Sequence, residues 1–229
     1  MAYTKNILLV GSDETLNEIL MENFNLHDEF CLKTSEGTND IVYYIEEYFL
    51  DIALIDITSA GEKIIEIFKL IQGTDSQFPI LLISDAGLDF KSIIGSTYEL
   101  TDYIVKPFKF VDLISKLRSQ INAFERSDAA TFAVGSHLFH PSTNTLFDNE
   151  KNKEVRLTEK ESAILNHLYR SRNKIVSRST LLQQVWGYNA NIATHTLETH
   201  IYRLRQKLEQ SPPKARILVT ELGGYRLVI

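Results

Sequence analysis

Two periods of apolar residues divide the first half of the chain into strands and helices. Continuous apolar runs, typical of strands buried on both faces, occupy residues 6–10, 51–56, 79–84 and 102–105. Apolar residues at helical spacing fill residues 16–24, 64–71 and 111–118. Residues 30–33 supply one further strand. Because strands alternate with helices, the pattern predicts a parallel sheet with helices on both faces.

The second half of the chain has a different order of elements. Residues 132–147 contain short alternating stretches separated by turn-forming residues, which predict small antiparallel strands. Two helices follow. Thr158 and Glu161 form the pattern of a capping box at the start of the first helix. Ser177 caps the second helix, which ends at Trp186.

A third helix is predicted over residues 193–208, with two contrasting faces. Its apolar stripe consists of Leu197, Ile201, Leu204 and Leu208. The opposite face carries no acid and presents Thr199, Tyr202, Arg203 and Gln206. Such donors suit the major groove of DNA, where Arg pairs with guanine and Gln with adenine. An ordinary amphipathic helix with a solvated basic face fits this stretch equally well.

The residues after this helix favour the first of these interpretations. Pro212-Pro213 ends the helix, and residues 217–220 then have the composition of a strand. Gly223-Gly224 is expected to form a hairpin turn, with residues 225–229 as the returning strand. A helix followed by a terminal hairpin is the layout of a winged helix.

Charge is distributed unevenly between the two halves. Of the chain's 229 residues, the first 124 carry 9 Lys and Arg against 20 Asp and Glu, whereas the remainder carries 15 against 10. A polyanionic partner is therefore plausible for the second half only. The single cysteine, Cys31, excludes an internal disulfide and suits a reducing cytosol. No apolar run or N-terminal leader indicates a membrane span or secretion.

Candidate chemistry lies at the carboxyl ends of the predicted parallel strands, where ligands bind in sheets of this kind. Asp56 and Ser84 end two strands, and Lys106-Pro107 follows the last one. The carboxylate could accept a phosphoryl group whose oxygens the hydroxyl and ammonium would bind. Alternatively, Asp56 caps the next turn and pairs with Lys106. A separate phosphoryl-transfer enzyme is disfavoured, because the chain has no Gly-rich phosphate loop.

Both halves resemble one protein family. Residues 185–187, 196–208 and 224–226 closely resemble the C-terminal domain of OmpR/PhoB-type response regulators. The order Asp56, Ser84, Tyr103-x-x-Lys106-Pro107-Phe108 is similar to a receiver domain. The resemblance implies a flavodoxin/CheY-like α/β receiver, with a doubly wound parallel five-stranded sheet, and an α+β winged helix-turn-helix domain. The expected boundaries are 1–122 for the receiver, 123–130 for a linker and 131–229 for the winged helix.

By this resemblance, Asp56 is the phospho-acceptor position, Ser84 and Tyr103 form the switch pair, and Lys106 contacts the phosphoryl group. Gly11 and Ser12 depart from the pattern at the positions where the family has the acidic pair that binds Mg²⁺, and Ala60, Ile64 and Asp85 also differ from the usual residues. Since Mg²⁺ favours carboxylate oxygens, we expect no Mg²⁺ cofactor and no metal-dependent phosphorylation.

Asp13 or Glu14 could replace the missing acids, although a straightforward alignment turns Asp13 away from the pocket. That alternative leaves a conventional regulator switched by phosphorylation of Asp56.

The family also dimerises through the last receiver helix and the strand before it. The matching residues here are Lys91, Ile94, Asp102, Val111, Asp112, Ile114, Lys116 and Arg118. They imply a homodimer, although a solvated charged helix would show the same charges.

The resemblance places DNA contacts on the winged helix. Base edges are assigned to Thr199, His200 and Arg203, with Tyr202 and Gln206 as further candidates. Phosphates are assigned to Thr196, Arg205, Trp186 and Tyr225. Glu221-Leu222 departs from the usual wing, and Arg226 is expected to compensate in part for the carboxylate.

The sequence therefore predicts a DNA-binding transcriptional regulator of the bacterial cytoplasm, which is not an enzyme. Its expected partners are double-stranded DNA with promoter repeats and a second copy of the chain. The resemblance also allows RNA polymerase and a sensor histidine kinase as partners. An adaptor that has lost DNA binding is the remaining alternative, because Glu221 would be repelled by the minor groove.

Overall fold

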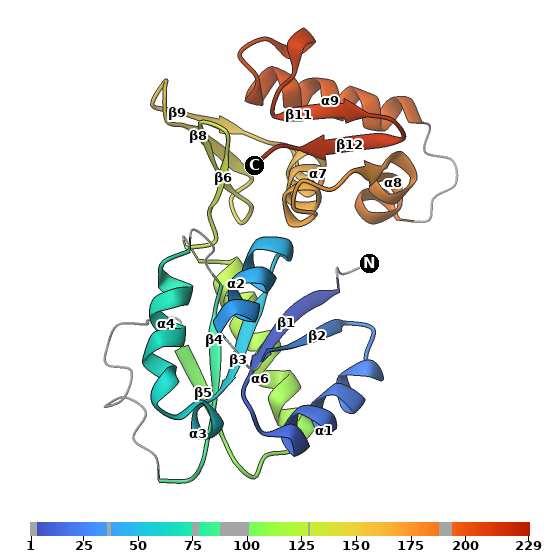
Figure 1. Ribbon diagram of the computed structural model, residues 1–229. Coiled ribbons are helices and arrows are strands. Elements are labelled where there is room, and N and C mark those ends of the chain that lie inside the picture. The colour runs from blue at the N-terminus through green and yellow to red at the C-terminus, as the bar shows by residue number, and fades with distance from the viewer. Residues whose placement is uncertain (1–3, 36–37, 75–77, 88–100, 128, 188–193) are drawn as a thin grey trace. The chain divides into compact units, whose positions relative to one another are not determined.

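The computed structural model describes residues 4–35, 38–74, 78–87, 101–127, 129–187 and 194–229. The chain divides into two compact units, residues 2–129 and 130–229 (Figure 1). Each unit has its own buried hydrophobic residues. No helix in the described ranges is long and apolar enough to cross a membrane.

The first unit is built on a parallel sheet, as predicted. Its strands are β1 (Lys5–Val10), β2 (Phe30–Ser35), β3 (Ile52–Asp56), β4 (Ile80–Ser84) and β5 (Thr101–Val105). They pair side by side in the order β2-β1-β3-β4-β5, which places β3 at the centre. Its helices are α1 (Glu14–Asn25), α2 (Thr38–Glu47), α3 (Ile57–Ala60), η1 (Gly61–Lys63), α4 (Ile64–Gln72) and α6 (Phe110–Glu125).

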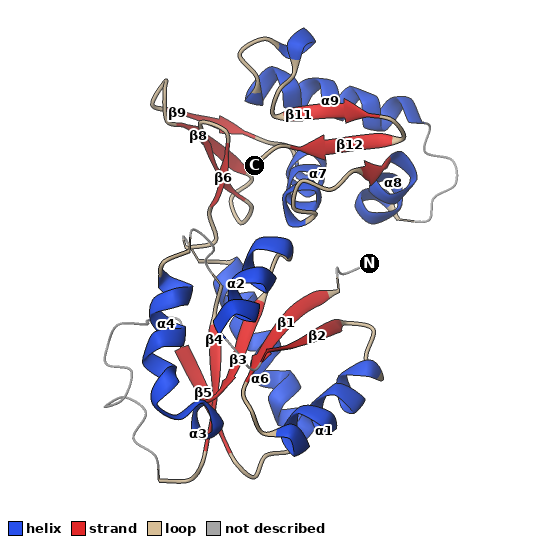
Figure 2. Cartoon of the chain, viewed as in Figure 1, coloured by secondary structure: helices blue, strands red, loops and turns tan. Residues whose placement is uncertain are grey.

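Helices cover both faces of this sheet (Figures 1 and 2). Side chains of α1 and α6 form one core with the sheet, and those of α2 and α4 form the other. The doubly wound five-stranded architecture is therefore confirmed. Helix α2 was not predicted, and α6 extends to Glu125, so the first residues of the expected linker are helical.

The second unit has the order of a winged helix. A four-stranded antiparallel sheet contains β6 (Phe132–Val134), β7 (His137–His140), β8 (Thr145–Asp148) and β9 (Lys153–Arg156). The helices are α7 (Glu159–Arg170), α8 (Arg178–Trp186), α9 (Thr194–Leu208) and the short η2 (Pro212–Lys214). A three-stranded sheet combines β10 (Val176–Ser177) with the hairpin of β11 (Leu218–Glu221) and β12 (Gly224–Leu227).

The predicted helix starts are confirmed in detail. The Thr158 hydroxyl accepts a hydrogen bond from the Glu161 N–H at 3.3 Å, and the Glu161 carboxylate accepts one from the Thr158 N–H at 2.8 Å. The Ser177 hydroxyl accepts a hydrogen bond from the Thr180 N–H at 3.0 Å. These side chains satisfy backbone donors that the first turn of a helix leaves without partners.

The hairpin turn lies one residue earlier than expected. Leu222 and Gly223 form it, since Glu221 pairs with Gly224, and Gly223 adopts a φ of +95°. Gly224 belongs to β12 instead. A Cβ atom there would lie 2.0 Å from the Val176 carbonyl oxygen, so the close approach of β10 requires glycine.

Candidate functional site

The receiver pocket is centred on Asp56 at the end of β3, where the residue is 1% exposed. Its Oδ1 atom accepts a hydrogen bond from the Thr58 N–H at 3.2 Å and so caps α3. Its Oδ2 atom accepts one from Lys106 Nζ at 3.0 Å. Each oxygen of the buried carboxylate thus has a partner. This is the arrangement of the alternative in which Asp56 caps the next turn and pairs with Lys106.

Lys106 also faces a second carboxylate. Its Nζ atom lies 3.7 Å from Oδ2 of Asp13, whose Oδ1 atom accepts a hydrogen bond from the Leu16 N–H and caps α1. The expectation that Asp13 points away from the pocket is therefore wrong, because the cap on α1 turns its free oxygen toward Lys106. One ammonium group now neutralises both acids.

Ser59 is a pocket residue that the sequence analysis missed. Its Oγ atom accepts a hydrogen bond from the Ser12 N–H at 3.1 Å, and its carbonyl accepts one from the Ser12 hydroxyl at 3.2 Å. A Cβ atom on Gly11 would lie 2.8 Å from Ser59 Oγ and 3.0 Å from Asp56 Cβ. Any side chain at position 11 therefore requires the Ser59 hydroxyl to move from this position.

The charges of this pocket are already balanced by Lys106, which bears on whether it could hold a Mg²⁺ ion. Mg²⁺ requires a near-octahedral shell of oxygens, usually with one or two carboxylates and several waters. Here the Lys106 ammonium lies between the two carboxylates and Ser59 closes the side of Gly11. Among the residues that the structure describes, no group of three or more His, Cys, Asp and Glu side chains could hold a metal ion.

The two switch positions lie in different surroundings. Ser84 is 1% exposed at the end of β4, and its carbonyl accepts the Lys106 N–H at 2.8 Å. Tyr103 on β5 is 42% exposed, and its ring centroid lies 6.0 Å from Lys116 Nζ.

Three charged residues of the expected dimer face, Asp102, Lys116 and Arg118, have partners within the chain. Lys116 donates to Asp102 at 2.7 Å, and Arg118 makes hydrogen bonds with both oxygens of Glu29. Burial alone would raise the pKa of Asp102, but hydrogen bonds from Lys116 and the backbone lower it below its usual value. Hydrogen bonding by Arg118 likewise lowers the pKa of Glu29.

The apolar residues of that face divide into two groups. Ile114 is 5% exposed and belongs to the receiver core, so its assignment to an interface is wrong. Val111 is 66% exposed, and Asp112 beside it is also exposed. Lys91 and Ile94 lie outside the described residues.

Helix α9 presents the predicted polar face. Leu197, Ile201 and Leu204 are buried in the domain core. On the opposite side, the outward-facing residues are Thr199, Tyr202, Arg203 and Gln206. Gln206 donates to the Tyr202 hydroxyl at 3.1 Å, and the Thr199 hydroxyl donates to the His195 carbonyl. Thr196, in the first turn, is half-buried.

His200 packs against the neighbouring helix. Its ring centroid lies 5.4 Å from that of Trp186, and Lys160 Nζ also lies 5.4 Å from the Trp186 ring centroid. Burial lowers the pKa of His200, and the charges of Arg203 and Lys160 act in the same direction against an opposing effect of Glu161. The contact between the His200 and Trp186 rings therefore joins α9 to α8.

Three residues assigned to the DNA backbone or the wing have partners inside the domain. Arg205 donates to the Leu218 carbonyl at 2.9 Å and to the Thr220 hydroxyl at 2.8 Å, which ties α9 to the wing. Tyr225 is 4% exposed beneath the Arg178 guanidinium. Arg226 pairs with Glu221 at 2.5 Å, so the wing carboxylate is neutralised locally.

Comparisons with known proteins agree with this arrangement. Residues 152–227 match the family described as transcriptional regulatory protein, C terminal. The regulatory protein VanRc of Enterococcus gallinarum is 27% identical over 95% of this chain and 96% of its own length. The DNA-binding response regulator MtrA of Mycolicibacterium smegmatis is 25% identical over 97% and 96%, respectively.

Solved structures include the response regulator DrrB of Thermotoga maritima, an OmpR/PhoB homologue. It is 23% identical, with a TM-score of 0.44, and covers 98% of this chain and 99% of its own. Residues 152–227 thus match a transcriptional regulatory C-terminal domain, and the chain is similar over nearly its whole length to a regulatory protein and to a DNA-binding response regulator.

Proposed function

We propose that the protein is a sequence-specific transcriptional regulator that reads duplex DNA through the outer face of α9. Arg203 carries this proposal. Its side chain is exposed, and in the described part of the chain no acid pairs with its guanidinium, although many other charges in the domain are paired. A free guanidinium on a helix anchored by a buried stripe suits bidentate contact with guanine.

The Arg203→Ala variant tests this proposal. Loss of a bidentate base contact costs about 1–3 kcal/mol of specific binding, and it relaxes specificity at one base position. The measurement is the equilibrium affinity for a site selected from a random duplex library, at fixed salt. Lys153→Ala is the matched control, because it removes an exposed cation on β9. Equal losses in both variants would reduce the role of Arg203 to nonspecific charge.

The second part of the proposal concerns the receiver, which we infer acts without Mg²⁺-dependent phosphorylation. The ammonium of Lys106 takes the place of a metal charge between Asp56 and Asp13, and Ser59 blocks position 11. In a phosphorylation site a bound cation neutralises the carboxylates. In this pocket the Lys106 ammonium does so. The chain itself catalyses no reaction under this proposal.

One observation favours the conventional alternative. Asp13 does face the pocket, so a second carboxylate is available if Lys106 moves aside. In that case a sensor histidine kinase would phosphorylate Asp56, and this phosphorylation would switch the regulator as in a conventional response regulator. An attempt to phosphorylate the purified chain directly distinguishes this alternative from the proposal.

We further propose that the chain acts as a homodimer in the bacterial cytoplasm, where it meets promoter repeats and RNA polymerase. The apolar residues available on the receiver face are Tyr103, Val105 and Val111. Because Lys116 and Arg118 already have partners within the chain, apolar contact would supply most of the dimer's stability.

The Val111→Asp variant tests this surface. A carboxylate at a residue that is 66% exposed leaves the fold intact but places like charges across a two-fold axis. We expect the wild type to sediment as a dimer and the variant to sediment as a monomer in sedimentation equilibrium at tens of micromolar. The matched control is Ile65→Asp, on an exposed apolar residue of α4. A wild type that sediments as a monomer would contradict the dimer.

A further inference from the structure

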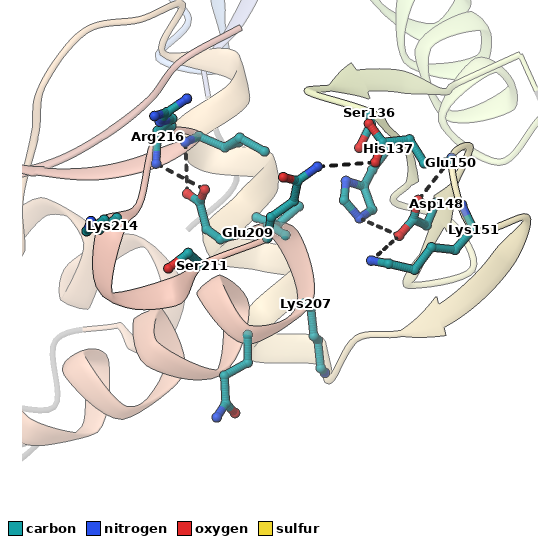
Figure 3. A pocket seen from close by; sticks show the side chains of 14 residues that line it. Ser136, His137, Asp148, Glu150, Lys151, Lys207, Glu209, Ser211, Lys214 and Arg216 are labelled. Carbon is teal, nitrogen blue, oxygen red and sulfur yellow. Dashed lines mark hydrogen bonds and ion pairs between the residues drawn. The ribbon is translucent and has the colours of Figure 1, made fainter.

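Two residues on the outer face of α9, Tyr202 and Gln206, are joined by a hydrogen bond. They are one helical turn apart, and the Gln206 amide nitrogen donates to the Tyr202 hydroxyl oxygen at 3.1 Å. Both side chains are exposed. Gln206 also borders the cavity of about 460 Å³ drawn in Figure 3, but among the described residues its amide makes no hydrogen bond to the other residues of that cavity. The amide is therefore held on the face that we propose reads DNA.

The hydrogen bond leaves a defined set of polar groups on the Gln206 amide. A glutamine amide has two N–H donors and one carbonyl acceptor. With one N–H directed to Tyr202, one donor and the carbonyl remain for a ligand. Adenine presents the matching groups in the major groove, an N7 acceptor beside an N6 amino donor. Guanine presents two acceptors there, N7 and O6, so the amide carbonyl would face a second oxygen.

The neighbouring polar side chains of α9 offer other combinations. Arg203 has donors only, which suits guanine. The Thr199 hydroxyl directs its proton to the His195 carbonyl at 2.8 Å. The Glu198 carboxylate, 3.5 Å from the His195 ring nitrogen, has acceptors only. The amide of Gln206 carries a donor and an acceptor in one plane, which is what bidentate pairing with adenine requires.

Helix α9 gives this pair a fixed support. Arg205 joins the helix to β11 through two hydrogen bonds. At the end of the helix, Glu209 accepts three backbone N–H groups from residues 216–218, and Figure 3 shows its carboxylate turned toward Arg216. Ordering a free glutamine side chain during binding costs conformational entropy, and a hydrogen bond formed beforehand removes part of that cost.

We propose that Tyr202 is a positioning residue that fixes the Gln206 amide to read an adenine close to the guanine read by Arg203. Arg203 and Gln206 are three residues apart, so their side chains are neighbours on one helix face. Because base pairs follow one another at about 3.4 Å along the duplex, the two side chains reach neighbouring base pairs. This inference rests on the proposed function, since it assigns a base to the same face of α9.

The test measures base preference with the full chain, and its probe is the duplex selected from the random library. Each variant is titrated at fixed salt with this duplex and with versions that carry guanine in place of one adenine. The wild type should prefer adenine at one position by at least about fivefold, and Gln206→Ala should abolish that preference. Tyr202→Phe keeps the ring and removes the hydroxyl, and it should lower the preference about two- to tenfold.

The double variant Tyr202→Phe/Gln206→Ala separates positioning from direct contact. If the hydroxyl acts through the amide, Tyr202→Phe changes binding by less than about twofold once Gln206 is replaced by alanine. Gln210→Ala is the matched control, because Gln210 is also an exposed glutamine but its amide donates to Glu150 at 3.3 Å. This control should leave the adenine preference unchanged.

Two results would overturn the inference and leave the proposed function standing. One is a selected site in which no adenine preference depends on Gln206, although Arg203→Ala still relaxes specificity at its own position. The other is an equal loss from Tyr202→Phe with and without Gln206, which would show that the hydroxyl contacts DNA by itself. A chain that selects no sequence from the library would overturn the proposed function and this inference together.

Discussion

The Lys207→Met variant is expected to lower the free energy of unfolding of the DNA-binding unit by about 2–3 kcal/mol. Lys207 Nζ donates to Glu161 at 2.7 Å, and the Glu161 side chain is 1% exposed. Breaking a fully buried pair costs about 3–5 kcal/mol because the remaining charge is uncompensated, and the 26% exposure of Lys207 reduces that figure. Urea unfolding followed by fluorescence of Trp186, the only tryptophan, measures the loss in this unit.

The stability contributed by the Glu161–Lys207 pair is expected to depend on pH in a defined direction. Burial alone would raise the pKa of Glu161, but hydrogen bonds from Lys207 and the Thr158 N–H lower it below its usual value. Stability from the ionised carboxylate is therefore complete above its unfolded pKa, about 4.3, and is lost as the pH falls through the lower folded pKa. The difference between wild type and Lys207→Met should be largest near neutral pH and shrink as the pH falls, because burial raises the pKa of Glu161 once Lys207 is removed and the carboxyl group of the variant takes up a proton first.

Glu161→Gln/Lys207→Met is the matched control, because glutamine keeps the capping box without a buried charge. It should recover most of the lost stability. If the free energy of unfolding of Lys207→Met lay within about 0.5 kcal/mol of the wild-type value, the pair would contribute no more than a surface contact.

The second large effect is a gain of metal binding in the receiver. In the Gly11→Asp/Ser12→Asp/Ser59→Gly variant, the Ser59 hydroxyl no longer blocks position 11, and two carboxylates join Asp56. Each adds at least about 1 kcal/mol of attraction to a cation, even at the dielectric constant of water. Mg²⁺ affinity in calorimetric titration should therefore rise more than about tenfold.

Gly11→Asp alone is the informative comparison. Its Cβ would lie 2.8 Å from Ser59 Oγ, so this variant should lose stability and gain little metal affinity. If the wild-type chain bound Mg²⁺ as tightly as the triple variant, the pocket would have found other ligands, and the role given to Ser59 would be wrong.

The elements that could be predicted from sequence are those set by local rules. The stripe that includes Leu197 and Leu204 follows from helical spacing, and the Thr158–Glu161 box follows from helix-end chemistry. Helix α2 escaped notice, although Ile41 and Ile45 are buried at i, i+4, because the tyrosines between and after them obscure the pattern.

The pocket depended on contacts between distant segments, which local patterns do not determine. Ser59 lies three residues after Asp56, yet its effect is on Gly11 and Ser12 from another strand end. Arg205 has the appearance of a phosphate contact in sequence, but β11 lies close enough to take its hydrogen bonds. The Arg226–Glu221 pair could not be predicted from local patterns either, because the pairing of two strands brings these side chains together.

The most direct measurement is the intact mass of the purified chain after incubation with Mg²⁺ and acetyl phosphate, with Asp56→Ala as the control. The proposed function predicts no phosphoryl adduct on either protein, because Lys106 and Ser59 occupy the surroundings of Asp56. An adduct on the wild type that is absent from Asp56→Ala would contradict it, and would make the protein a conventional phosphorylation switch with an unusual metal site.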